Sequence, residues 1–269
     1  MRKTLIPAQR RERIQDYITT HKVARLADLS KMLNASEATI RRDLEKLEDT
    51  GFLERTHGGA VLSQRLSREP EYQQRLRNSP HEKRLIGQLA ASLIEDGDVV
   101  FINGGTTTTE IIRHIRPSAD ITVITNNLFA ALEIDDIGFE LILLGGIYQQ
   151  VSLSVGGFFS IDNLKQVYAD KTFIGVDGIS LKYGCTFPTS AEAEVVRTMM
   201  GRTRGPVYIV ADHSKWGTVS NYEAAKIEKI HSLITDAGFD MNARQSLSTQ
   251  SVEIFIAQDN ISDTGYHKE

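Results

Sequence analysis

The segment from Ser36 to Leu44, with the sequence SEATIRRDL, holds side chains that can recognise a nucleic acid. Ser36 suits a helix N-cap, because its hydroxyl can accept from the free N–H groups of the first helical turn. Ile40, Leu44 and Leu47 recur at helical spacing and predict a buried stripe, which leaves the two arginines after Ile40 on the outside. An exposed arginine can bind phosphates or the acceptor atoms of guanine. The segment therefore predicts a DNA-recognition helix.

A second run with possible chemistry is rich in glycine and threonine. Gly104–Glu110 follows the apolar residues Val99–Ile102 and leads into a helical pattern. Glycines let the backbone approach a phosphate, the first N–H groups of a helix point toward it, and threonine hydroxyls add donors. The same composition also makes an ordinary strand-to-helix turn, so both interpretations stay open for this run alone.

Polar side chains also follow the later apolar runs, as in Thr125-Asn126-Asn127 and Asp212-His213-Ser214-Lys215. In a parallel sheet these segments meet at the carboxyl edge, where ligands bind. Cations there suit a phosphate, and carboxylates and amides suit hydroxyls, so the set predicts a site for a phosphorylated polyol. The residues expected to bind it are Gly105, Thr106, Thr107, Thr108, Asn126, Asn127, Asp177 and Lys215.

The elements that position the first segment form a small N-terminal domain, residues 1–62. Apolar periodicity predicts helices over Arg10–Thr20 and Val23–Leu33, and the polar turn 34–36 joins the second of these to the recognition helix. Phe52–Thr56 and Ala60–Leu62, separated by His57-Gly58-Gly59, predict a β-hairpin that would form a wing. The residues expected to contact DNA are Ser36, Glu37, Thr39, Arg41, Arg42, Arg55 and His57.

The elements that position the second set alternate between strands and helices over residues 81–258. Helices are expected at His81–Glu95, Thr109–Ile115, Leu128–Glu133, Glu192–Met200 and Asn221–Lys226. Strands are expected at Val99–Ile102, Ile121–Ile124, Glu140–Leu144, Thr172–Val176, Val207–Val210, Ser232–Thr235 and Val252–Ile256. This alternation predicts an α/β domain with a mostly parallel sheet. Residues 63–80 are expected to be a linker and residues 259–269 a disordered tail.

Charge divides the chain in the same way. Residues 1–68 hold 14 Lys and Arg against 9 Asp and Glu, whereas the remainder holds 17 against 26. A basic N-terminal part suits a polyanion. The single cysteine, Cys185, excludes an intrachain disulfide. We expect a cytoplasmic protein with no membrane segment, no metal site and no cofactor, because no signal-peptide pattern, long apolar run or Cys/His cluster is present.

The N-terminal pattern resembles a known family. Arg10-x3-Ile14-x3-Ile18, followed by Ser36-x2-Thr39-Ile40-Arg41-Arg42-Asp43-Leu44, is similar to the signature of DeoR/GlpR bacterial transcriptional regulators. A three-helix module that binds protein or RNA is the alternative, but it leaves the exposed arginine pair without a role.

Residues 81–258 resemble ribose-5-phosphate isomerase, which implies a sugar-phosphate-isomerase-like fold. The resemblance matches 105–108 to a phosphate loop, Asp177 to an active-site aspartate, and Asp212-x-Ser214-Lys215 to a loop carrying a lysine. An isomerase needs a positioned base, and the resemblance would require a second aspartate where this chain has Ser180. We therefore expect a binding pocket and no catalytic residues.

Together these features predict a transcriptional regulator controlled by a ligand. The family resemblance implies a repressor of a carbohydrate-catabolism operon that is released by a phosphorylated sugar. Its partners would be double-stranded operator DNA, the phosphorylated sugar and further copies of itself, since one such head covers only a half-site. A sugar-phosphate isomerase with a DNA-binding head is the alternative.

Overall fold

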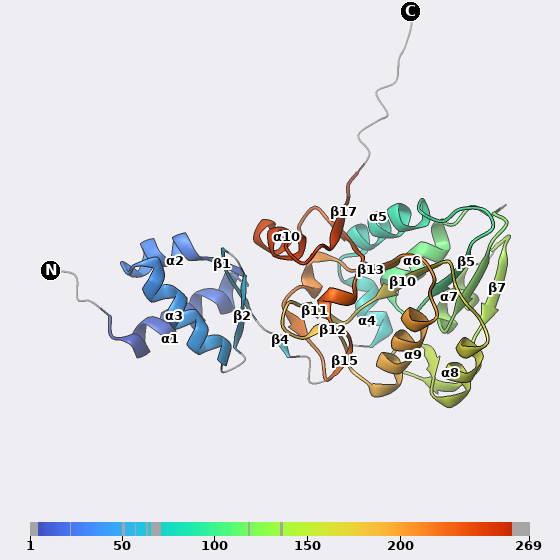
Figure 1. Ribbon diagram of the computed structural model, residues 1–269, viewed down its shortest axis with the longest axis horizontal. Helices are drawn as coiled ribbons and strands as arrows, with labels where there is room; N and C mark the ends of the chain where they lie inside the picture. Colours follow the sequence, from blue (N-terminus) through green and yellow to red (C-terminus); the bar gives the residue numbers. More distant parts are fainter. Residues whose placement is uncertain are drawn as a thin grey trace, which may run out of the picture.

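The computed structural model describes residues 5–259 apart from 22, 50, 51, 57, 63, 66–70, 118, 135 and 136. Figure 1 shows two parts, a smaller N-terminal part, here called the head, and a larger C-terminal part, here called the body. Residues 260–269, which make up nearly all of the predicted disordered tail, lie outside the described residues. Within the described residues, no helix combines the length and apolar character needed to cross a bilayer.

The head has the element order of a winged helix-turn-helix. Its elements are α1 (Pro7–His21), β1 (Val23–Arg25), α2 (Leu26–Leu33), α3 (Glu37–Asp49), β2 (Leu53–Thr56) and β3 (Gly59–Leu62). Apolar side chains from the three helices and from the small sheet bury one another in a single cluster. The antiparallel β2–β3 hairpin confirms the predicted wing.

The predicted helix Val23–Leu33 is wrong at its start. Val23–Arg25 is the extended strand β1, with Val23 opposite Val61 of β3, and α2 begins only at Leu26. β-Branched Val23 suits this third strand, so pairing with the wing prevails over the helical spacing of the apolar residues. The strand fixes α2 to the wing sheet.

A buried ion pair ties α1 to the recognition helix. The Arg10 guanidinium binds the Asp43 carboxylate, and both side chains are nearly inaccessible to solvent. Asp43 lies on the same face of α3 as Ile40, Leu44 and Leu47. The pair therefore fixes which face of α3 is turned toward solvent.

A fully parallel seven-stranded sheet forms the centre of the body. In spatial order its strands are β17 (Glu253–Ala257), β16 (Ser232–Asp236), β13 (Val207–Val210), β10 (Lys171–Gly175), β5 (Val99–Ile102), β6 (Thr122–Thr125) and β7 (Glu140–Leu143). All adjacent pairs are parallel. This confirms the predicted α/β architecture. The strand order reverses between β5 and β10.

Helices cover the sheet and bury an apolar cluster against each of its faces. They are α5 (Pro80–Ala91), α6 (Thr106–His114), α7 (Leu128–Glu133), α8 (Phe158–Lys165), α9 (Ser190–Gly201) and α10 (Met241–Ser248). Two short 3-10 turns, η1 (His213–Lys215) and η2 (Ile227–Lys229), complete the body. The sequence prediction missed α8 and α10, which are each two turns long.

Short antiparallel strands lie outside the main sheet. β8 (Ile147–Gln149) pairs with β9 (Ser154–Gly156), and β12 (Gly184–Phe187) lies between β11 (Gly178–Ser180) and β15 (Tyr222–Ala225). The predicted helix Asn221–Lys226 is therefore wrong. Its residues form β15, whose Ala224 and Ala225 are buried, because the backbone of the segment is bonded to β12.

The segment that joins head and body contains regular structure. β4 (Gln64–Arg65) pairs with β14 (Thr218–Val219) of the body, and α4 (Tyr72–Arg77) lies on the body just before α5. Tyr72 and Arg75 of α4 are buried. The second half of the predicted linker 63–80 is thus attached to the body.

Candidate functional site

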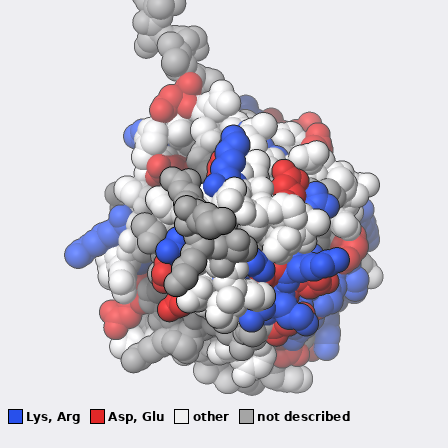
Figure 2. Space-filling view, turned by 90° about the vertical axis from the view of Figure 1, so that its left-hand side faces the viewer, with Lys and Arg blue, Asp and Glu red and all other residues white. Residues whose placement is uncertain are grey.

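The outer face of α3 carries the predicted DNA contacts. Ser36 accepts a hydrogen bond from the backbone N–H of Thr39 at 3.2 Å, which confirms the predicted cap, and the two hydroxyls lie 2.9 Å apart. Glu37, Arg41 and Arg42 are exposed. Figure 2 views this end of the molecule and shows basic side chains gathered on one side of it, with acidic ones among them.

Of the two DNA contacts predicted for the wing, Arg55 is described and exposed. Arg55 donates to Glu48 of α3 at 2.8 Å, which holds the guanidinium along the flank of the helix. His57 lies outside the described residues. The wing turn itself faces the body, because a Cβ on Gly58 would come within 2.6 Å of Asn242 Oδ1 on α10.

The second site lies where the strand order of the body reverses. After β5 the chain continues toward one edge of the sheet, and after β10 it continues toward the other edge. Open α/β sheets bind ligands in the crevice between two such diverging connections. Asn103, directly after β5, joins the two strand ends: its side-chain amide donates to Gly175 O at 3.0 Å and accepts from Gly175 N at 2.8 Å.

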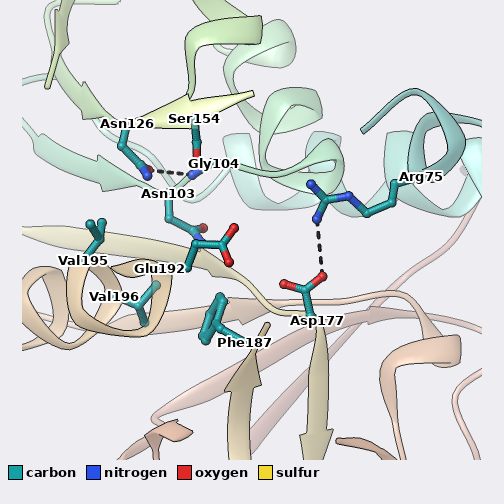
Figure 3. Close-up of a pocket in the computed structure, with 10 residues that line it drawn as sticks. All are labelled: Arg75, Asn103, Gly104, Asn126, Ser154, Asp177, Phe187, Glu192, Val195 and Val196. Carbon is teal, nitrogen blue, oxygen red and sulfur yellow. Dashed lines mark hydrogen bonds and ion pairs between the residues drawn. The ribbon is translucent and has the colours of Figure 1, made fainter. Parts of the chain in front are cut away.

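A small polar cavity occupies this point, here called the switch-point cavity (Figure 3). It is lined by Arg75, Asn103, Gly104, Asn126, Ser154, Asp177, Phe187, Glu192, Val195 and Val196. The enclosed free space is about 10 Å³, the room of roughly one water molecule. The cavity is therefore nearly filled by its own side chains.

An ion pair spans the cavity. Arg75 Nη1 lies 3.3 Å from Asp177 Oδ1, and both side chains are about nine-tenths buried. Arg75 comes from α4 and Asp177 from the end of β10, so residues 102 positions apart meet here. The sequence prediction missed Arg75, because no local pattern in 63–80 marks a residue whose partner lies so far along the chain.

A second carboxylate lies beside the pair. Glu192, near the start of α9, accepts from the Thr189 hydroxyl at 2.8 Å. Burial, and then the neighbouring Asp177, raise the pKa of Glu192 above its ordinary value. One buried cation thus faces a buried acid and a half-buried one, a set that can bind a ligand carrying both an anionic group and hydroxyls.

Lys83 holds the end of α4 in place. Its ammonium donates at 2.6 Å to the carbonyl oxygens of both Arg75 and Asn78. Burial lowers the pKa of Lys83 to about 8, and the nearby Asp212 acts in the opposite direction. Tyr72, one turn before Arg75, bonds to the Thr109 hydroxyl at 2.7 Å. These contacts attach α4 to both α5 and α6.

The glycine-threonine run forms the start of α6. The helix begins at Thr106 after Gly105, and Gly104 N donates to Asn126 Oδ1 at 2.7 Å. Thr108 and Thr109 turn their hydroxyls back onto Gly105 O. Of the predicted effector residues, Asn126 and Asp177 line the cavity, whereas Gly105 and the threonines 106–108 do not.

Two other predicted residues lie farther from the cavity. Asn127 caps α7 by accepting from Ala130 N at 3.1 Å and donates to Thr109, so its side chain is used within the scaffold. Lys215, in η1, does not line the cavity, although its charge acts on Lys83. Within the described residues, no three His, Cys, Asp or Glu side chains are grouped as metal ligands would be.

The head contacts the body next to this site. Glu54 of β2 is 4% exposed, and its carboxylate lies beside Ser180 at the end of β11, with Lys182 nearby. Burial, then the charge of Glu48, raise the pKa of Glu54 to about 7, against the lowering effect of Ser180. Gly217 also lies against Val61 of the wing. β11 thus connects Asp177 in the cavity with the wing.

Two family models match the chain. The description "DeoR-like helix-turn-helix domain" matches residues 10–65, and "DeoR C terminal sensor domain" matches residues 78–237. These two ranges correspond to the head and to most of the body.

Curated relatives match over nearly the whole length. The transcriptional regulator GlpR of Haloferax volcanii is 32% identical over 93% of this chain and 98% of its own. The transcriptional repressor GlcR of Bacillus subtilis is 35% identical over 91% of this chain and 94% of its own.

Among solved structures, ribose 5-phosphate isomerase A from Neisseria gonorrhoeae is similar with a TM-score of 0.37 and 13% identity, over 52% of this chain and 53% of that one. With both domain models matched in order and full-length relatives above 30% identity, this chain belongs to the DeoR family of DNA-binding transcriptional regulators.

Proposed function

We propose that this protein represses a carbohydrate-catabolism operon in the cytoplasm, binds its operator as a homo-oligomer, and is released by a phosphorylated sugar in the switch-point cavity. The observation that carries the proposal is the Arg75–Asp177 pair. Because Arg75 belongs to the segment that joins head to body, a ligand that binds it acts directly on the connection to the DNA-binding domain.

The cavity residues suit the two ends of a sugar phosphate. A guanidinium such as that of Arg75 binds phosphate oxygens in a bidentate way, and the free N–H groups at the start of α6 favour an anion. Asp177, Glu192 and Asn126 would then bind sugar hydroxyls. Lys83 and Lys215 add positive charge on the same side.

The filled cavity implies a change of shape on binding. With free space for about one water molecule, a sugar phosphate can enter only if Arg75 leaves Asp177. The ligand would thereby favour an arrangement in which α4 and β11 have shifted. Such a ligand controls the protein only through its different affinity for the two arrangements.

The outer face of α3 would enter the major groove of the operator. Arg42 lies on the exposed side of the helix and Arg41 on its flank, where it lines a cavity between head and body together with Leu181. A shift of the body segment around Leu181 would therefore change the surroundings of Arg41. The relative named as a repressor supports repression as the direction of control.

A sugar-phosphate isomerase with a DNA-binding head is not favoured. The curated relatives are named as regulators. The position at which the isomerase resemblance requires an aspartate is Ser180, which accepts from Tyr183 N and lies beside Glu54 of the wing. This hydroxyl serves the contact between head and body.

The test is to titrate the complex of protein and operator DNA with a panel of sugar phosphates. We expect one of them to release the labelled DNA, as measured by fluorescence anisotropy, and to raise the melting temperature of the free protein by mass action. Arg75→Gln should bind the operator but require at least tenfold more ligand for release.

Arg116→Gln is the matched control, because this exposed arginine pairs with Asp96 away from the cavity. It should respond like the wild type. If Arg75→Gln releases DNA at the wild-type ligand concentration, the ligand site lies elsewhere and the proposal is wrong.

A further inference from the structure

One edge of the body exposes an unusual number of large apolar side chains. They come from β7, from β8 and from the start of α8, and we call them the edge patch: Ile142, Leu143, Ile147, Tyr148, Phe158 and Phe159. In Figure 1, β7 and α8 lie at the end of the body opposite the head. The wing contacts and the switch-point cavity do not use these side chains.

Contacts between β8 and the start of α8 bring members of the edge patch together. The rings of Phe158 and Phe159 have their centroids 5.7 Å apart. A Cβ on Gly157, the residue before them, would meet Ile147 Cδ1 at 3.2 Å. Ser160 of α8 donates to Gly145 O at 2.7 Å, which joins the helix to the turn after β7.

The aromatic side chains of the patch present about half the area that one partner buries in a standard interface. Tyr148, Phe158 and Phe159 are 53%, 73% and 66% exposed, and at roughly 200 Å² for a whole aromatic side chain they present about 400 Å². That is about half of the ~800 Å² that each partner buries in a standard interface, before the three aliphatic members are added. Single monomers rarely leave a larger apolar surface uncovered.

The charge of the segment indicates what covers it. From Leu141 to Ile161 the chain contains no Asp, Glu, Lys, Arg or His, although a quarter of all its residues are charged. An acidic or basic partner finds no complementary charge here, whereas the same surface can face itself without repulsion. In the described structure β7 also pairs only with β6, so its other edge is open, and open strand edges pair readily with a second copy.

The patch is connected to the switch-point cavity. β8 and β9 are paired with Tyr148 opposite Val155 and Gln149 opposite Ser154. Ser154 lines the cavity, and Val155 N donates to Asn126 O at 2.9 Å. A shift of β9 on ligand binding would thus move β8 within the patch.

We propose that the edge patch is the surface through which two copies of this chain associate, in a two-fold symmetric contact that leaves both heads uncovered. This inference rests on one part of the proposed function, the homo-oligomer, and assigns the surface through which that oligomer forms. In a two-fold contact each copy supplies the same patch, so one substitution changes both sides.

The test is sedimentation velocity of the full chain over a range of concentrations without DNA. Phe158→Glu and, separately, Ile147→Glu should weaken association at least tenfold and shift the protein toward monomer, with melting curves of the monomer that remain cooperative. Met241→Glu is the matched control, since Met241 is an apolar residue of α10 that is 63% exposed and lies outside the patch.

Two outcomes separate the two proposals. A wild-type protein that stays monomeric at all concentrations overturns both the homo-oligomer and the interface. If the wild type associates and both patch variants associate equally well, the homo-oligomer stands and the edge patch is not its interface. Should Phe158→Glu fail to fold, Ile147→Glu decides the result.

Discussion

We predict that Glu54 makes the contact between head and body sensitive to pH. The pKa of this buried carboxyl is raised from 4.5 to about 7 when the head is docked on the body. At 1.36 kcal/mol per pKa unit, the ionised carboxylate is therefore disfavoured by a free energy of about 3 kcal/mol in this docked state. The docked state binds the proton more tightly, so the contact is strongest at low pH. The contact between head and body weakens as the pH rises from about 4.5 through 7. Above that range the contact carries the full free-energy cost of burying the ionised carboxylate.

The expected effect follows by integrating proton binding between the two states. From pH 5.5 to pH 8 the wild type should lose about 2 kcal/mol of stability in the head–body contact. Glu54→Gln keeps the shape and can still bond to Ser180 but carries no charge. Its head should therefore be docked more firmly at pH 8, by up to ~3 kcal/mol.

Hydrogen exchange of the head amides at pH 5.5, 6.5 and 8, corrected for intrinsic rates, measures this contact. Glu45→Gln, an exposed change on α3, serves as the control and should follow the wild type. The reasoning is refuted if wild type and Glu54→Gln show the same dependence of protection on pH.

Three further predictions concern separate parts of the chain. Arg42→Ala should weaken operator binding by about 1–3 kcal/mol if the arginine contacts a base edge, whereas unchanged affinity in a gel shift would remove Arg42 from the DNA surface. Asp43→Asn should destabilise the head by roughly 3 kcal/mol, because it leaves the Arg10 charge buried without its carboxylate partner. Urea unfolding, followed through the transition of the head, measures this loss, and a value below about 1 kcal/mol would contradict the prediction. Cys185 should not react with a thiol reagent at pH 8 in the native protein, since burial raises its pKa to about 12, and rapid labelling would show that the residue is accessible.

The head could be predicted from sequence because its signals are local. The cap at Ser36 and the spacing of Ile40, Leu44 and Leu47 lie within 12 residues, and the structure confirms both. The central strands were found for a related reason: each is a short apolar run, buried in the inner strands and more exposed in the edge strand β7. Errors arose where pairing with a distant strand decided the conformation, as in Val23–Arg25 against β3 and Tyr222–Ala225 against β12.

The candidate site could be predicted only in part. Asn126 and Asp177 follow strands of the sheet. The general rule that ligands bind at the carboxyl ends of parallel strands was therefore sufficient to find them. Arg75 was missed because it enters from a helix that precedes the domain and meets its partner 102 residues later. Glu192 is not among the residues predicted to bind the ligand, since its position beside Asp177 depends on how α9 packs.

The Arg75–Asp177 pair has a consequence for the concentrations to which the protein responds. The Asp177 carboxylate already binds the Arg75 guanidinium, so it competes with any anionic ligand for that cation. Because it belongs to the same chain, this carboxylate competes at a fixed local concentration. Each ~1.4 kcal/mol that the pair contributes raises the apparent dissociation constant of the ligand tenfold. Under the proposed function, the strength of a single internal ion pair would set the ligand level at which the operator is released, and substitutions at position 177 would adjust that threshold without altering the DNA-binding surface.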